Sequence, residues 1–267
     1  MDWIETFYTK RSEWMGPTGI FPSHRVRAAS IERYSGAGKK RILELGAGAG
    51  GTAAAMADLG HSVIAVELSP LRASFAQELA QEPRQGQLTV IEGDYYTLDF
   101  PEPFDLISHW DSFGMGTDAD NRRLLQRMAE DWLAPEGCVL MDVFSPWWWI
   151  RQAGTEERDE ERGLMRRYDF DPIGGRLLDQ WWPIGDKSQL VTQTVRCYTP
   201  ADFILLIEGT GLAIETFAID GNTFRADESS TMAHHLWNAL SYVVKLGLAN
   251  FTNKHYQSNL SIKNVRL

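Results

Sequence analysis

Residues 41–52 read Arg-Ile-Leu-Glu-Leu-Gly-Ala-Gly-Ala-Gly-Gly-Thr, and they are the part of the chain most informative about its fold. Its first part, which ends at Leu45, is a short apolar run typical of a strand buried in a parallel sheet. Four glycines follow, at positions 46, 48, 50 and 51, and an Ala-rich segment from Thr52 to Leu59 predicts a helix. Glycine lets backbone approach a ligand closely, and a helix N-terminus offers free N–H groups. The stretch therefore predicts a strand–turn–helix corner that binds a nucleotide-like ligand.

Two ligand classes fit these glycines. Gly46, Gly48 and Gly51 satisfy the dinucleotide pattern G-x-G-x-x-G, and Glu67 follows Gly46 by 21 residues, where a ribose-binding acid is expected. Glu44, however, lies two residues before the first glycine. A carboxylate at this place suits a cationic ligand that carries a sulfonium and an α-ammonium group, whereas it would repel a pyrophosphate. Glu44 therefore favours a sulfonium cofactor over NAD.

Composition limits the partners and the compartment. The 267 residues contain no apolar run near the roughly 18 residues that a transmembrane helix needs, so we expect no membrane span. The first residues lack the pattern of a signal peptide, and the chain has two cysteines, which favours a reduced, cytoplasmic protein. A net charge of −10 disfavours a nucleic-acid partner, because duplex binding depends on cations that neutralise phosphates. Ten tryptophans favour aromatic walls around a small-molecule pocket, although core packing explains any single one as well.

The rest of the chain continues the alternation of strands and helices. Turn and capping residues separate apolar runs, and a Thr117–Asp120 capping box opens one of the helices. This alternation predicts a doubly wound sheet, with ligands outside the carboxyl ends of its strands. The predicted fold class is α/β, with a mostly parallel, seven-stranded, Rossmann-like sheet. Its strands after the first are expected at 62–66, 88–91, 104–108, 139–144, 214–219 and 242–248.

Residues 146–198 interrupt this pattern. Strand-forming runs at 166–170, 176–182 and 190–198 predict a small antiparallel β insertion after the fifth strand. The charged run 156–162 is interpreted as a solvated face. We expect four segments: an N-terminal cap segment at 1–38, a cofactor-binding core at 39–145, the insertion as a substrate roof at 146–198, and the remainder of the core sheet with a C-terminal tail at 199–267.

The chain resembles a class I S-adenosylmethionine-dependent methyltransferase of the broad group that acts on small molecules. The resemblance covers roughly residues 40–145 well and 195–220 more loosely. It implies that S-adenosylmethionine is the cofactor and S-adenosylhomocysteine the product. The insertion resembles that of sugar-amine and glycine-type N-methyltransferases, where it helps to roof the substrate pocket. The residues that match the cofactor-binding motifs are Glu44, Gly46, Gly48 and Gly50 for the methionine part, Glu67 with Leu68 for the ribose, Asp94 with Tyr95 for the adenine, and His109 at the end of the fourth strand.

Two residues are candidates for the chemistry. His109 is the first candidate for a general base, because imidazole titrates near neutrality, although a histidine bonded into the strand end is an equal alternative. Asp111 either orients a cationic amine or caps the following turn. The sequence from His109 to Ser112 differs from the Asn/Asp-Pro-Pro-Tyr motif of DNA amino-methylating enzymes. We assign no metal site, and we expect the acceptor pocket to be lined by Tyr8, Trp14, Trp110, Trp147 and Trp148.

The expected function is methyl transfer to nitrogen or oxygen of a small-molecule acceptor. An NAD-dependent oxidoreductase and a non-catalytic cofactor-binding protein with the same fold are the alternatives. The sequence leaves open the acceptor, the methylated atom and the oligomeric state, a homodimer included.

Overall fold

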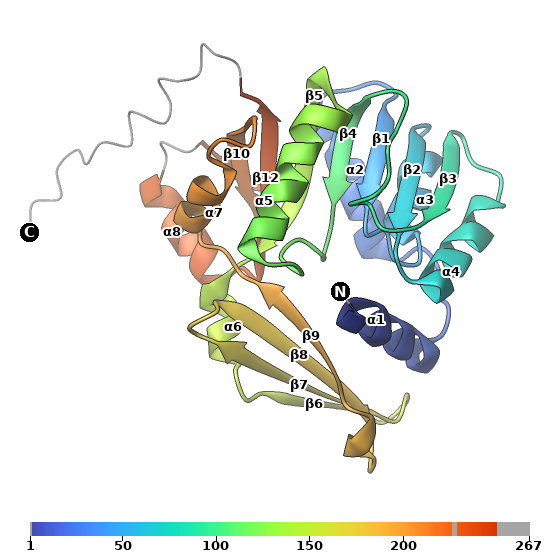
Figure 1. Cartoon of the computed structure of the whole chain (residues 1–267), viewed down its shortest axis with the longest axis vertical. Coiled ribbons are helices and arrows are strands. Elements are labelled where there is room, and N and C mark those ends of the chain that lie inside the picture. Colours follow the sequence, from blue (N-terminus) through green and yellow to red (C-terminus); the bar gives the residue numbers. More distant parts are fainter. Residues whose placement is uncertain (1, 226–228, 250–267) are drawn as a thin grey trace, which may run out of the picture.

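The computed structural model describes residues 2–225 and 229–249. Its central layer is an eight-stranded sheet in the order β11-β10-β12-β5-β4-β1-β2-β3 (Figure 1). Strands β1 to β5 pair in parallel, and β12 runs antiparallel between β5 and β10. The strands are β1 Arg41–Leu45, β2 Ser62–Glu67, β3 Gln87–Glu92, β4 Phe104–His109, β5 Leu133–Phe144, β10 Leu212–Ile219, β11 Asn222–Phe224 and β12 Ser241–Leu248. The mostly parallel α/β sheet is confirmed.

The predicted strand count was wrong, because the sheet has eight strands and not seven. The additional strand, β11, forms a hairpin with β10 in which Ile219 faces Asn222. Between them, Asp220 and Gly221 both have positive φ, 48° and 79°, as a type I′ hairpin turn requires. Three residues carry too little alternation for such a strand to be predicted from sequence.

Helices cover both faces of the sheet, as in a doubly wound fold. Because side chains alternate along a strand, Leu43 of β1 joins the core under α5 and α7, while Ile42 joins the core under α2 and α3. The Thr117–Asp120 capping box at the start of α5 is confirmed. The helical segments are α1 Asp2–Met15, α2 Pro22–Ser35, α3 Gly51–Asp58, α4 Pro70–Ala80, α5 Asp118–Arg127, the π-helical turn Met128–Trp132, α6 Pro146–Gln152, α7 Pro200–Ile207 and α8 Ser229–Asn238.

A separate four-stranded antiparallel sheet follows β5. It comprises β6 Glu156–Asp159, β7 Leu164–Asp171, β8 Arg176–Pro183 and β9 Val191–Arg196, in that order. The predicted β insertion is therefore present, with one strand more than expected. The charged run at 156–162 begins as the edge strand β6, where Glu157 faces Arg166 and Glu156 faces Arg167 across the ladder. Its first residues are exposed as expected, and these cross-strand ion pairs stabilise the strand.

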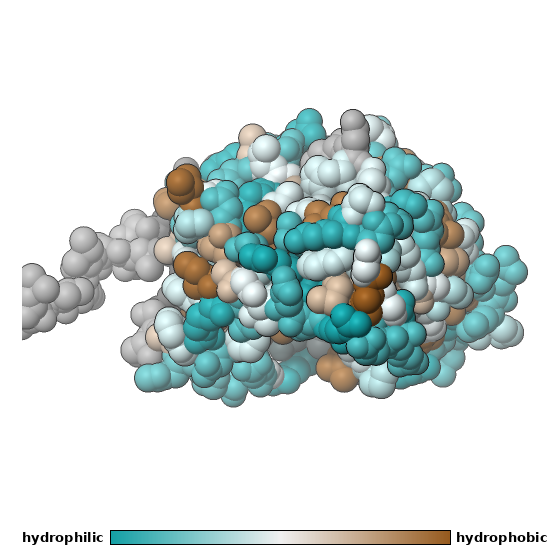
Figure 2. Space-filling model, turned by 90° about the horizontal axis from the view of Figure 1, so that it is seen from below, coloured by the Kyte–Doolittle hydropathy of each residue, from teal (hydrophilic) through white to brown (hydrophobic). Residues whose placement is uncertain are grey.

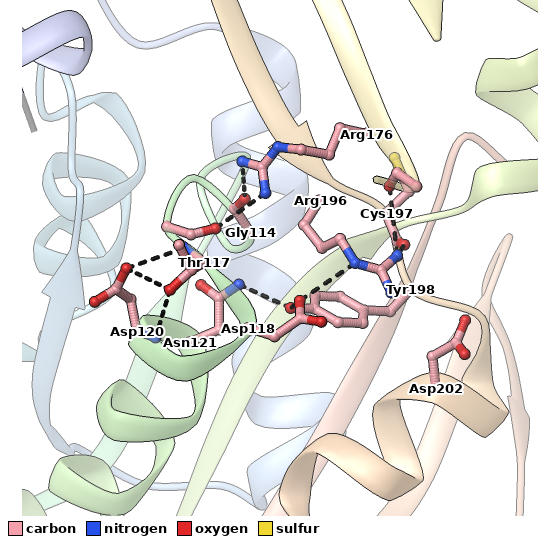
Figure 3. Close-up of polar contacts among 12 residues, drawn as sticks. Gly114, Thr117, Asp118, Asp120, Asn121, Arg176, Arg196, Cys197, Tyr198 and Asp202 are labelled. Carbon is pink, nitrogen blue, oxygen red and sulfur yellow. Dashed lines mark hydrogen bonds and ion pairs between the residues drawn. The ribbon is translucent and has the colours of Figure 1, made fainter. Parts of the chain in front are cut away.

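A polar network fixes this small sheet to the loop after β4 (Figure 3). The Arg176 guanidinium donates to the carbonyl oxygens of Gly114, Met115 and Gly116, each at 3.1 Å, and the Arg196 backbone N–H donates to Gly114 O at 2.8 Å. Gly114 has a φ of 102°, and a Cβ there would collide with the Arg196 carbonyl oxygen. This glycine therefore allows the close approach of the small sheet to the loop.

Helix α1 lies between the core and the small sheet (Figure 1). Its Tyr8 ring lies under the Arg72 guanidinium of α4, at 4.6 Å from carbon to ring centroid. Thr9 Oγ1 and Ser69 Oγ share a hydrogen bond of 3.2 Å. On the other side, Phe7 and Tyr8 pack in one apolar cluster with Trp181 of β8. The N-terminal segment thus forms one wall of the space between the two sheets.

The surface seen from below is mostly hydrophilic, with small and separate hydrophobic patches (Figure 2). Scattered apolar side chains of this kind are normal for a protein surface, so this face offers no broad apolar docking area. In the described part of the chain, no helix is long and apolar enough to cross a membrane.

Candidate active site

One cavity of about 890 Å³ connects the glycine corner with the inner face of the small sheet. The carboxyl ends of the core strands, helix α1 and strands β7 to β9 form most of its walls, and residues of α2, α4 and α6 complete them. Small-molecule sites typically measure roughly 300–1,000 Å³, so this volume has room for a cofactor and a small acceptor together.

The glycine loop is shaped by close approaches. Gly46 and Gly48 have φ values of 64° and 61°, and a Cβ on Gly48 would collide with the Arg72 guanidinium. The Gly48 N–H donates to Glu67 Oε2 at 2.8 Å, and the Ser69 N–H donates to Glu67 Oε1 at 2.9 Å. Glu67 therefore ties the loop to the end of β2, and its carboxylate also lines the cavity. This position suits a ribose diol, whose hydroxyls donate to remaining lone pairs.

Glu44 lines the same cavity from β1 and is only 3% exposed. Its Oε2 has no hydrogen-bond partner among the residues that the structure describes. Burial raises the pKa of Glu44 to about 8. A buried carboxyl oxygen without a partner is costly, and a cation beside it would favour the charged form. The site therefore fits a ligand that carries a sulfonium or ammonium group.

A charged pair lies beside Glu44. Asp111, with a φ of 57°, accepts one hydrogen bond of 2.6 Å from Arg27 Nη2, and its Oδ2 forms an ion pair with Arg27 Nη1 at 2.6 Å. Both side chains line the cavity. The Asp111 backbone N–H donates to Asp142 Oδ1 at 2.7 Å. Burial, and then the charge of Asp111, raise the pKa of Asp142. Arg27 and Asp111 together offer complementary charges to an α-carboxylate and an α-ammonium group. Arg27 was not predictable from the sequence, because its pairing with Asp111 joins segments 84 residues apart.

The cavity continues beyond the glycine corner, where it is lined by Leu68, Asp94 and Tyr95. Asp94 Oδ1 accepts from the Tyr96 backbone N–H at 2.9 Å, which leaves its second carboxylate oxygen for a ligand amine. Burial raises the pKa of Tyr95, so its hydroxyl stays neutral. The three residues predicted to contact the ribose and the adenine therefore lie in the wall of the same cavity.

Tyr8 and Trp110 line the cavity as expected, but Trp14, Trp147 and Trp148 are not among its lining residues. Trp149 lines it instead, and its Nε1–H donates to the Leu240 carbonyl oxygen at 3.1 Å. Successive residues on a helix are turned by about 100°, so three consecutive tryptophans cannot share one direction. Trp147 packs against the main core, and Trp14 packs in the cluster between α1 and the small sheet.

His109 is fully buried and does not line the cavity. Its ring lies between Tyr95 and Phe113, with centroid distances of 5.9 and 6.0 Å, and its Nε2 is 3.3 Å from Ser112 Oγ. Burial lowers the pKa of His109 to about 4. This geometry disfavours the predicted general base, because a neutral imidazole beneath the glycine loop has no access to an acceptor. It agrees with the alternative of a histidine bonded into the strand end.

The small sheet contributes a polar row that the sequence did not predict. Tyr168, Asp179 and Gln193 face one another across β7, β8 and β9, and all three line the cavity. Arg166 donates two bonds to Asp179, at 2.8 and 2.9 Å. Period-2 alternation was the available signal, but the strand register that aligns the row is set by tertiary pairing. Within 2–225 and 229–249, no group of three or more His, Cys, Asp or Glu side chains is placed to hold a metal ion.

Comparisons with known proteins agree with this geometry. The family described as the methyltransferase domain matches residues 42–137, which span the glycine corner and strands β1 to β4. A curated relative, the cypemycin N-terminal methyltransferase of a Streptomyces species, is 28% identical over 157 residues. That match covers 58% of this chain and 54% of the relative, so the chain matches about half the length of this relative.

Solved structures share the whole fold. The CcbJ methyltransferase from Streptomyces caelestis has a TM-score of 0.71 and 22% identity, covering 93% of this chain and 97% of that one. CalS10, described as an amino pentose methyltransferase from Micromonospora echinaspora, has a TM-score of 0.58 and 18% identity. The match covers 90% of this chain and 96% of CalS10. At these identities the likeness concerns the fold alone. Together with the matching domain and the methyltransferase relative, it supports the assignment of this chain to the class I S-adenosylmethionine-dependent methyltransferases.

Proposed function

We propose that the protein transfers a methyl group from S-adenosylmethionine to an amine nitrogen of a small molecule bound beneath the small sheet. The observation that carries this proposal is the single cavity of about 890 Å³ that joins the glycine corner to strands β7 to β9. Nitrogen is favoured because two relatives are described as an N-terminal methyltransferase and an amino pentose methyltransferase. The net charge of −10 disfavours a nucleic-acid acceptor.

When bound, S-adenosylmethionine supplies an electrophilic methyl group, which passes to the acceptor nitrogen as the carbon–sulfur bond breaks and S-adenosylhomocysteine is left. The chain contributes binding and alignment. Glu44 would face the cationic centre, Arg27 and Asp111 would hold the amino-acid end, and Glu67 and Asp94 would hold the adenosine. Much of the rate enhancement of such an in-line displacement comes from orientation and from the exclusion of water.

The amine must be neutral when it attacks, so its protonation needs control. Asp179 is 5% exposed, lines the acceptor side of the cavity and pairs with Arg166. Its carboxylate can accept N–H bonds from the acceptor and thereby orient the nitrogen lone pair. We assign His109 a structural role, because its ring is buried outside the cavity.

The test is a panel of small amines and alcohols with matched carbon skeletons, incubated with cofactor that carries a deuterated methyl group. Mass spectrometry then identifies labelled products. We expect labelled amines and unlabelled alcohols. Labelled alcohols alone would contradict the choice of nitrogen. Binding of the cofactor without any labelled product in the panel would support the non-catalytic alternative.

A further inference from the structure

Two arginines of the cavity wall lack an acidic partner. Five arginines line the cavity, and Arg27, Arg162 and Arg166 each pair with an aspartate. Within residues 2–225 and 229–249, the guanidinium groups of the other two, Arg11 of α1 and Arg72 of α4, form neither an ion pair nor a hydrogen bond. Each lies instead over an aromatic ring: Arg11 over Trp181 at 5.1 Å and Arg72 over Tyr8 at 4.6 Å.

These two guanidinium groups belong to one region. Burial lowers the pKa of Arg11, and the positive charge of Arg72 lowers it further. Tyr8, three residues before Arg11 on the same helical face, lies within the field of both cations. The Arg11 Nε is buried without a partner. Asp179 attracts Arg11 without forming an ion pair with it. Two neighbouring positive charges that are partly removed from water and form no direct ion pair are unfavourable, unless a ligand brings a negative group.

The nearest acidic groups are already engaged. Glu67 accepts from the Gly48 and Ser69 N–H groups and forms no ion pair with Arg72 in the described structure. Asp179 is held by the two bonds from Arg166. The amino-acid end of the cofactor has its own complementary pair in Arg27 and Asp111. Arg72 adjoins Gly48 of the glycine loop, and Arg11 lies over Trp181 of the small sheet, so their charge is available to a second ligand that lies next to the cofactor.

We propose that the methyl acceptor carries an oxyanion, a carboxylate or a phosphate, which Arg11 and Arg72 bind; this inference rests on the proposed function. Planar guanidinium groups present paired N–H donors that match both oxyanions. The acceptor is then an amine with a negatively charged group at its other end. The aromatic surfaces under the two arginines hold the guanidinium groups in place before the acceptor arrives.

The test uses simple anions, so that it does not depend on knowing the acceptor. The protein is saturated with S-adenosylhomocysteine, which covers the cofactor corner, and is titrated with propionate and, separately, with methyl phosphate at constant ionic strength. Tryptophan fluorescence provides the signal, because Trp181 lies against Arg11. We expect saturable binding. The anion that binds more tightly shows whether the site prefers a carboxylate or a phosphate. Arg11→Gln and Arg72→Gln should each weaken it by about tenfold or more, the loss expected for a charge-assisted hydrogen bond.

Lys10→Gln is the matched control. Lys10 neighbours Arg11 on the same helix, but it is exposed and pairs with Glu13 at 2.9 Å. Its replacement should leave anion affinity within about twofold, since an exposed pair contributes little. Arg11→Lys, which keeps the charge, should retain more affinity than Arg11→Gln, and thermal unfolding shows that each variant folds.

The proposal is overturned if neither anion binds saturably, or if both glutamine variants bind as the wild type does. It is also overturned if these variants lose affinity for S-adenosylhomocysteine, because the arginines would then belong to the cofactor site. Failure of the proposed function gives a different result: anion binding that depends on Arg11, without methylation of any amine.

Discussion

At the scale of single residues, Glu44 makes the stability of the ligand-free protein depend on pH. Its folded-state pKa of about 8 lies above the ordinary value of 4.5. The folded protein holds the proton of the Glu44 carboxyl group more tightly than the unfolded chain does. The resulting stabilisation is complete below the ordinary pKa and is lost as pH rises through about 8. We therefore expect the free energy of unfolding of the ligand-free protein to fall between about pH 5 and pH 8, and to fall less steeply in Glu44→Gln.

Urea unfolding at a series of pH values measures the slope of the free energy of unfolding against pH. Asp142 contributes in the same direction, because its pKa is raised as well, so Glu44→Gln should retain part of the slope. Glu13→Gln, an exposed carboxylate paired with Lys10, serves as the control and should keep the wild-type slope. Equal slopes in wild type and Glu44→Gln would show that Glu44 is ionised in the folded protein.

His109 gives a second prediction at this scale. Because its neutral ring is buried between Tyr95 and Phe113, His109→Gln should lower the free energy of unfolding by about 1–3 kcal/mol, the usual range for a disturbed core. The affinity for S-adenosylmethionine and the turnover of folded enzyme should change little. A large loss of turnover at unchanged stability would restore His109 as a general base.

At the scale of elements, the small sheet depends on its attachment to the loop after β4. Gly114→Ala places a Cβ against the Arg196 carbonyl oxygen at a φ of 102°, so it should displace the sheet (Figure 3). We expect a loss of about 1–3 kcal/mol in stability and a higher KM for the acceptor, with cofactor affinity nearly unchanged. Gly209→Ala is the control: its φ is 74°, but nothing lies within 4 Å of the added Cβ. A similar rise in KM in both variants would contradict the role of the attachment.

The elements also show what a sequence reveals. The glycine corner and the Thr117–Asp120 box were predictable, because local residue types determine a tight turn and a helix cap. The edge strands β6 and β11 were not, because pairing with a neighbouring strand creates them. The same limit applies to the site: Glu44 and Glu67 follow from motif positions, whereas Arg11 and the row at Tyr168 depend on the packing of α1 and the register of β7 to β9.

At the scale of the whole molecule, two sheets and one helix enclose a shared space. The carboxyl edge of the core sheet lines one end of the cavity, the small sheet lines the other, and α1 closes the side between them (Figure 1). Loss of any one wall would open the site to water. This arrangement explains why a chain of 267 residues uses a second sheet that the cofactor alone does not require.

The most direct test of the central claim is calorimetric titration of the protein with S-adenosylmethionine, S-adenosylhomocysteine and NAD. We predict that both adenosyl ligands bind one per chain, that NAD does not bind, and that Glu67→Gln weakens both adenosyl ligands by about 1–3 kcal/mol, because a charge-assisted acceptor for the ribose is lost. Binding of NAD together with no binding of S-adenosylmethionine would contradict the account.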